Sequence, residues 1–304
     1  MTALVPLPLL LPLLGAAVSL AAGRSRGVQR TVGVTTLAAV SVVAAALLAH
    51  VDGDGPVAVQ VGGWPAPVGI TLVADRTSVV LLLASVLTML AVLVFAVGEG
   101  GAERTQPGFH PLYLVLAAGV AASFLTGDLF NLFVAFEVML MASYALITLG
   151  GRPAQVRSGM TYVVISLVAS TLFLLSLAYV YAATGTVNMA DLHGKVAELP
   201  TGVRSGLALL LVVVFGIKSA VFPLFFWLPD SYPTAAAPVT AVFAGLLTKI
   251  GVYAMIRSQT LLFPAETRLG TLLLVVAGLT MVVGVLGAVA QNDVRRLLSF
   301  HIVS

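Results

Sequence analysis

Residues 216–254 read GIKSAVFPLFFWLPDSYPTAAAPVTAVFAGLLTKIGVYA, and this stretch decides the kind of fold to expect. It places two lysines, Lys218 and Lys249, inside apolar runs, and a proline, Pro223, shortly after the first lysine. Proline cannot donate a backbone hydrogen bond, and its ring clashes with the carbonyl four residues earlier, which here belongs to Ser219. We therefore expect a helix that breaks beside Lys218. An ordinary proline kink is the alternative for Pro223 taken alone.

The composition around this stretch is that of a membrane protein. Of the 304 residues, 60% are hydrophobic and 9% are charged, whereas soluble domains carry roughly 25% charged residues. A water-soluble surface cannot be built from so few charges. The alternating polarity of a transmembrane β-barrel is missing, so we expect an all-α polytopic membrane protein, a helix bundle in a bilayer.

The residue types also exclude several kinds of site. The sequence has no cysteine, which excludes iron–sulfur clusters and thiolate zinc sites within the chain. Its four histidines lie far apart and show no metal-ligand spacing, so we expect neither a metal site nor a cofactor. The basic residues are spread over short segments without a continuous run, and we do not expect nucleic acid as a partner.

Apolar runs that are long enough to cross roughly 30 Å of hydrocarbon, which takes about 20 helical residues, recur along the chain. They lie near residues 3–22, 31–49, 77–97, 111–127, 129–149, 159–183, 206–227, 238–256 and 269–290. The seventh run contains Pro223, so we expect a discontinuous helix there. A tenth run begins at Arg295 and stops at Ser304, about halfway across a membrane at the helical rise of about 1.5 Å. We interpret the sequence as a C-terminally truncated form of a longer protein.

The distribution of arginine and lysine predicts the orientation, because these residues favour cytoplasmic loops. With the N-terminus outside, the inner segments hold Arg24, Arg26, Arg30, Arg104, Arg152, Arg157, Arg295 and Arg296. The outer segments then hold Arg76, Lys195, Arg204, Arg257 and Arg268. The larger inner set predicts that the N-terminus lies outside.

Three charged side chains remain inside the apolar runs, namely Glu137, Lys218 and Lys249. An ionised side chain at the bilayer centre costs about 2.5–3.5 kcal/mol on insertion scales, so each needs a reason to be there. Counted along the helices, all three reach a similar middle depth. We interpret them as a row of titratable groups in which the charge of one changes the proton affinity of the next, as a proton relay requires. The alternative is an ion pair between Glu137 and one lysine that only fixes helix packing.

Three segments carry a resemblance to a known family. They are GDLFNLFVAFEVMLMASYALITLGG at residues 127–151, the stretch 216–254 quoted above, and QNDVRRLLSFHIVS at residues 291–304. From about residue 60 onward the sequence resembles the antiporter-like subunits that respiratory complex I shares with the multisubunit Mrp Na⁺/H⁺ antiporters. It is most similar to the D-type branch of the Mrp antiporter subunits.

The resemblance implies a specific architecture and a set of site residues. The fold would hold two inverted five-helix repeats, each with a broken helix, of which the first is complete in this sequence and the second only begun. Glu137 would pair with Lys218, Lys249 would continue the proton path, and His301 would correspond to a later histidine whose role is less defined. Two departures stand out: the turn that reads PDAH in the family reads PDSYP here, and the sequence stops before the second broken helix.

The resemblance also implies a function. The chain would be a proton-translocating subunit of a multisubunit Na⁺/H⁺ antiporter in the cell (plasma) membrane, a transporter rather than an enzyme. Its partners would be other hydrophobic subunits, protons, Na⁺ and the lipid bilayer. One alternative is a proton-pumping membrane subunit of a complex I-like NADH dehydrogenase or hydrogenase, and another is an assembly scaffold that does not transport.

Overall fold

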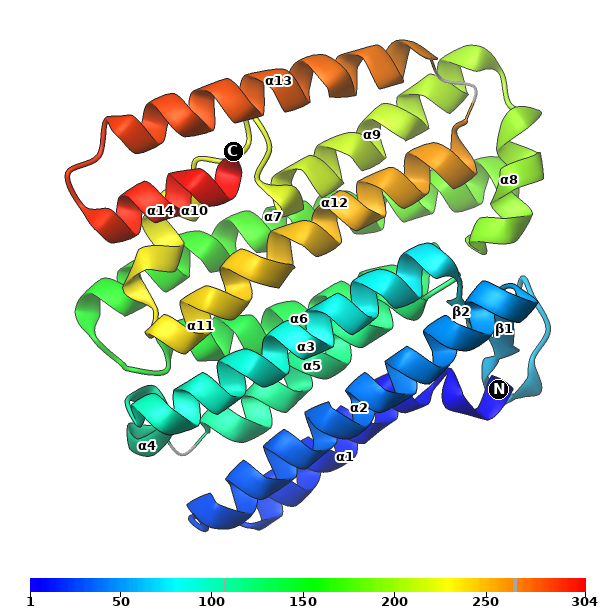
Figure 1. The fold of residues 1–304 in the computed structure, drawn as a ribbon. Coiled ribbons are helices and arrows are strands. Elements are labelled where there is room, and N and C mark those ends of the chain that lie inside the picture. The colour runs from blue at the N-terminus through cyan, green and yellow to red at the C-terminus, as the bar shows by residue number, and fades with distance from the viewer. Residues whose placement is uncertain (107, 265–266) are drawn as a thin grey trace. The chain divides into compact units, whose positions relative to one another are not determined.

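The computed structural model describes residues 1–106, 108–264 and 267–304. Helices dominate it, which confirms the predicted all-α polytopic membrane fold (Figure 1). Within these ranges, 8 helices are long and apolar enough to cross a bilayer, and a further apolar helix is 17 residues long. The chain divides into two compact units, Met1–Arg152 with Ala236–Leu246 and Pro153–Ala235 with Leu247–Ser304.

The first unit is built around one largely apolar helix. Its helices are α1 (Leu7–Ala21, after the 3-10 turn η1, Thr2–Leu4), α2 (Arg26–Asp54), α3 (Arg76–Glu99), α4 (Ala102–Thr105), α5 (Phe109–Leu125), α6 (Leu129–Thr148) and α11 (Ala237–Val242). Helix α5 packs against α1, α3 and α6, and α2 packs against α1 and α3. Because apolar residues predominate around α5, it is buried over nearly its whole length.

Local sequence explains where these helices begin and end. The carboxylate of Asp75 accepts a hydrogen bond from the backbone nitrogen of Ser78, and the hydroxyl of Ser78 accepts one from the backbone nitrogen of Asp75. This reciprocal pair is a capping box, and it starts α3. Gly100, at φ 68°, ends the same helix in the left-handed conformation that glycine adopts easily. Asp128 caps α6 through the backbone nitrogen of Asn131.

A small antiparallel hairpin interrupts the helices of the first unit. Strand β1 (Val57–Gln60) pairs with β2 (Thr71–Ala74), with Val57 opposite Ala74, and the 3-10 turn η2 (Val61–Gly63) follows β1. The sequence did not predict this hairpin, because its segments are too short to show a clear alternation.

The second unit contains α7 (Pro153–Thr184), α8 (Met189–Ala197), α9 (Thr201–Ser219), α10 (Leu228–Ser231), η3 (Tyr232–Thr234), α12 (Thr248–Arg257), α13 (Thr267–Val289) and α14 (Val294–Val303). Helix α9 packs against α7 and α12, and α13 packs against α14. Asn188 caps α8 and Asp293 caps α14 through side-chain oxygens.

The predicted discontinuity of the seventh run is confirmed. Helix α9 ends at Ser219, which is the residue whose carbonyl the ring of Pro223 would meet if the helix continued. The chain then turns and resumes a helix only at Leu228.

The eighth run differs from the expected regular helix. Two π-helical segments, η4 (Phe243–Leu247) and η5 (Ser258–Leu262), flank α12. The first of them lies directly before the turn of helix that carries Lys249, and such π segments occur frequently at functional sites.

Candidate functional site

Lys218 is the penultimate residue of α9 and is buried, with 9% of its surface exposed. Its ammonium Nζ donates to the hydroxyl of Ser170 on α7 at 3.3 Å. Phe173 and Phe215 pack edge to face about one turn away, with their ring centroids 5.2 Å apart. The lysine therefore ends in a closely packed, largely apolar contact between α7 and α9.

The chain break beside Lys218 is unusual in its backbone conformation. Ala220 adopts φ 55° and ψ 44°, in the left-handed region that residues with a Cβ seldom occupy. Such residues cost on the order of 1–3 kcal/mol and persist where the surrounding structure holds them. The residue in this strained conformation, Ala220, is two positions after the buried Lys218.

Neighbouring side chains satisfy the backbone groups that the break sets free. The indole nitrogen of Trp227 donates to the carbonyl of Ile217 at 3.1 Å, and the backbone nitrogen of Phe222 donates to the hydroxyl of Thr280 on α13 at 2.9 Å. Irregular backbone at membrane depth requires such partners, because lipid supplies none. Side chains of the same unit therefore stabilise the interrupted backbone.

Gly251 places α12 directly on the end of α9. A Cβ on this glycine would lie 2.7 Å from the backbone nitrogen of Ser219 and 2.9 Å from the carbonyl carbon of Lys218. Only glycine allows this approach, because both neighbours are backbone atoms. Packing of α12 on α9 therefore fixes the backbone that carries Lys218.

Lys249 lies two residues before Gly251, on an exposed face of α12. Its Nζ donates to the hydroxyl of Thr248 at 3.3 Å, and Thr248 itself is buried. Lys218 and Lys249 are therefore on two helices that pack against each other within one unit.

Glu137 belongs to the first unit. It lies on α6, is partly exposed, and sits two residues before Met139. A Cβ on Gly119 of α5 would be 2.7 Å from the backbone nitrogen of Met139, so α5 and α6 approach closely next to the glutamate.

His301 is placed on α14, and its side chain is exposed. Phe300 beside it packs edge to face against Phe225, with ring centroids 6.2 Å apart, and Arg296 pairs with Asp230 at 3.0 Å. Through these contacts, α14 packs against the segment that follows the end of α9 and contains Phe225 and Asp230.

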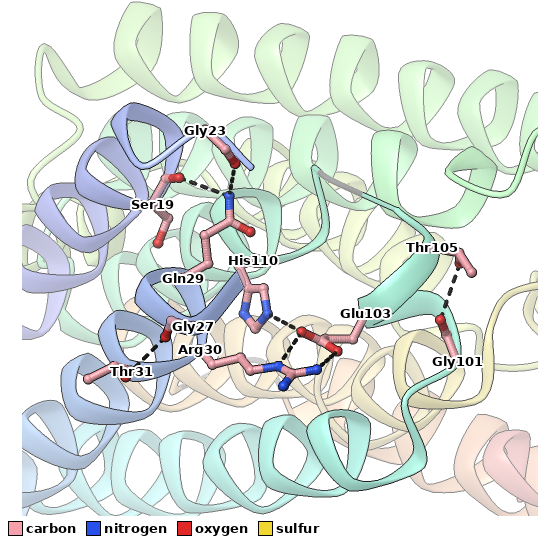
Figure 2. A network of polar contacts seen from close by, with 10 residues as sticks. All are labelled: Ser19, Gly23, Gly27, Gln29, Arg30, Thr31, Gly101, Glu103, Thr105 and His110. Carbon is pink, nitrogen blue, oxygen red and sulfur yellow. Dashed lines mark hydrogen bonds and ion pairs between the residues drawn. The ribbon is translucent and has the colours of Figure 1, made fainter. Parts of the chain in front are cut away.

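One polar cluster was missed by the sequence-based interpretation (Figure 2). Glu103 of α4, whose side chain is 0% exposed, receives two hydrogen bonds of 2.8 Å from the guanidinium of Arg30 on α2. The Nε2 atom of His110, on α5, lies 3.0 Å from the same carboxylate. The hydrogen bonds from Arg30 hold the pKa of Glu103 at about 2, although burial opposes this shift.

The first unit also contains a cavity beside this cluster. Its volume is about 370 Å³, and it is lined by Gly23, Arg24, Arg26, Gln29 and Glu103. No group of three or more histidine, aspartate or glutamate side chains that could hold a metal ion occurs among the described residues.

Comparison with known proteins identifies the family. Residues 126–304, more than half of the chain, match the family described as "NADH:quinone oxidoreductase/Mrp antiporter, TM". The chain belongs to this family. It is also 46% identical over 308 residues to the D-type subunit of the Na⁺/H⁺ antiporter of Alkalihalophilus pseudofirmus, a match that covers 100% of the chain and 62% of that protein.

Solved structures agree with this assignment. The Mrp complex from a Dietzia species contains a chain that matches with a TM-score of 0.93 at 36% identity, over 100% of this chain and 57% of that one. A chain of the membrane-bound sulfane sulfur reductase, an archaeal respiratory membrane complex, matches with a TM-score of 0.90 at 27% identity, over 100% and 63% of the two chains. This sequence thus spans less than two thirds of each of these relatives.

Proposed function

We propose that this chain is the proton-translocating part of a subunit of a multisubunit Na⁺/H⁺ antiporter. Protons move through the membrane along Glu137, Lys218 and Lys249, and His301 lies further along the path. Pro223 and the left-handed Ala220 interrupt the helix next to Lys218. The partners are other hydrophobic membrane subunits, and the transported ions are protons and Na⁺.

The observation that carries this proposal is the burial of Lys218 at the interrupted end of α9, where α7 and α12 both pack against it. Burying a lysine in a membrane is energetically costly, and intramembrane ionisable residues mark ion pathways. Its position at a helix break supports a transport role more than a packing role, because unwound backbone at mid-depth lines the sites of transporters.

The second candidate is the membrane subunit of a redox-driven proton pump. The match to the archaeal respiratory complex favours it, at 27% identity. The higher identity to the D-type subunit of an antiporter favours the first candidate.

Ion exchange in membrane vesicles distinguishes the two. The full-length protein is studied in its assembled complex, without respiratory substrates, and a Na⁺ gradient is imposed while the internal pH is followed. The proposal predicts Na⁺-dependent proton movement under these conditions. Proton movement that requires quinone reduction, and none driven by Na⁺, would establish the redox pump instead.

We further propose that the complex resides in the cell membrane with the N-terminus of this chain outside. The arginine cluster at the turn between α1 and α2 and at the start of α2, made of Arg24, Arg26 and Arg30, supports this orientation because such clusters favour the cytoplasmic side.

A further inference from the structure

The cavity at the turn between α1 and α2 is not explained by the proton path. It lies between two candidate membrane-spanning segments, Thr2–Ala21 and Arg26–Asp54, which places it at a bilayer surface. Its volume of about 370 Å³ is in the range of small-ligand pockets, which starts at roughly 300 Å³, and is far larger than the roughly 30 Å³ of one water molecule.

The walls of this cavity are held in place by buried polar contacts. Gln29 is 4% exposed, and its amide donates to the carbonyls of Ser19 at 3.0 Å and Gly23 at 2.8 Å, which fixes the turn (Figure 2). Gly23 adopts φ 56°, so the turn closes without strain. On the opposite side, Arg30 and His110 hold Glu103 in one position. These contacts fix the Gln29 and Glu103 sides of the cavity, and the side chains of Arg24 and Arg26 are exposed at its opening.

The charge balance of the cavity is positive. Arg30 neutralises Glu103 through a bidentate ion pair, which leaves Arg24 and Arg26 as uncompensated charges of the lining. In the described part of the chain, neither of these two arginines forms a salt bridge. The guanidinium group suits phosphate oxygens, because its fork of donors matches their geometry.

The first turn of α2 adds to the positive potential. Ser25 occupies the cap position, but its side chain accepts no hydrogen bond from the helix. The backbone N–H groups of this turn carry part of the helix dipole, which favours an anion nearby. Basic pockets between membrane helices at the bilayer surface are suited to anionic lipid headgroups.

We propose that this cavity binds a phosphate group that carries a net negative charge, with Arg24 and Arg26 as its ligands and Gln29 and Glu103 as the fixed wall. An anionic phospholipid headgroup and a soluble phosphate share this chemistry. None of the four residues of the proposed proton path lines this cavity, so the proposal gives Arg24 and Arg26 no part in proton transfer. If the two arginines serve only to orient the chain, no saturable binding occurs here.

Hydrogen–deuterium exchange of residues 19–30 in the assembled, detergent-solubilised complex tests the proposal. The soluble lipid dioctanoyl phosphatidylglycerol is titrated, and the half-saturating concentration for protection of this segment is measured. Dioctanoyl phosphatidylcholine, which has no net charge, serves as the lipid control. Inorganic phosphate and glycerol 3-phosphate, each added alone and in competition, separate a lipid source from a soluble one.

The double variant Arg24→Gln/Arg26→Gln is compared with Arg157→Gln/Arg295→Gln, which removes two exposed arginines elsewhere. We expect saturable protection by the anionic lipid, a half-saturating concentration raised at least tenfold in the first variant, and a change below twofold in the second. Saturable protection by soluble phosphate alone, lost in the first variant, also supports the site and assigns a soluble source. Equal shifts in both variants, equal protection by phosphatidylcholine, or no saturable protection would overturn the proposal.

Discussion

Replacing Gly251 by alanine tests whether the position of Lys218 depends on the packing of α12 against α9. The added Cβ would lie 2.7 Å from the backbone nitrogen of Ser219, whereas ordinary van der Waals contact begins at 3.4 Å. The two helices must therefore separate by roughly 0.7 Å at this point to restore an ordinary contact. Rotation of a side chain cannot relieve the overlap, because the atoms in the way belong to the backbone.

The expected effect on transport is larger than the effect on stability. Overpacking of this kind costs about 1–3 kcal/mol, and the preference of helices for alanine over glycine returns about 1 kcal/mol of it. The complex should therefore still assemble. Misplacing reacting groups by about 1 Å can slow a reaction about a hundredfold, so we expect the displaced Lys218 to lower proton flux roughly tenfold.

Na⁺-driven proton flux in vesicles, divided by the amount of assembled complex, is the measurement. Gly278→Ala is the matched control: it makes the same change in α13, where the new Cβ has no described atom within 4 Å apart from its chain neighbours and the backbone of its own helix. Flux of wild-type size per complex in Gly251→Ala would refute the idea that this close approach positions the lysine. A loss of similar size in Gly278→Ala would refute it equally.

Three further predictions concern the path, the buried cluster and the orientation. Lys249→Ala should remove most Na⁺-driven flux while the complex still assembles, as measured by flux per purified complex, and near-normal flux would contradict its relay role. Because the pKa of Glu103 is lowered from 4.5 to about 2, its ionised form adds stability above about pH 4.5, and this contribution is lost as the pH falls towards 2. The unfolding midpoint of wild type should therefore drop more than that of Glu103→Gln between pH 5 and 3, and parallel curves would show that the ion pair adds nothing. A cysteine-accessibility reporter at Arg26 should be labelled from the cytoplasmic side and one at Asp54 from outside, and the reverse pattern would overturn the orientation.

The sequence was most informative where a charge or a proline breaks an apolar run. Lys218 and Lys249 could be found because charged residues are rare in such runs, and the end of α9 at Ser219 follows from the ring of Pro223. The left-handed conformation of Ala220 could not be predicted, because alanine has no preference for it. Its geometry depends on tertiary contacts such as the hydrogen bond from Trp227.

Contacts between distant residues were beyond prediction from one sequence. Arg30 and Glu103 are 73 positions apart and read as ordinary loop charges, so their burial as an ion pair has no local signature. The same holds for the approach of Gly251 to α9, since glycine is common in membrane helices for several reasons. No pattern in the sequence predicted the π-helical segments beside α12.

Proton flux per assembled complex in Glu137→Gln and Glu137→Asp tests the proposed path most directly. Glutamine keeps the size and the hydrogen-bonding capacity of the side chain but removes its charge, and aspartate keeps the charge on a shorter arm. If Glu137 and Lys218 relay protons, flux should collapse in Glu137→Gln and remain in part in Glu137→Asp, with the amount of assembled complex unchanged. Wild-type flux per complex in Glu137→Gln would contradict the relay and support a packing role for the glutamate.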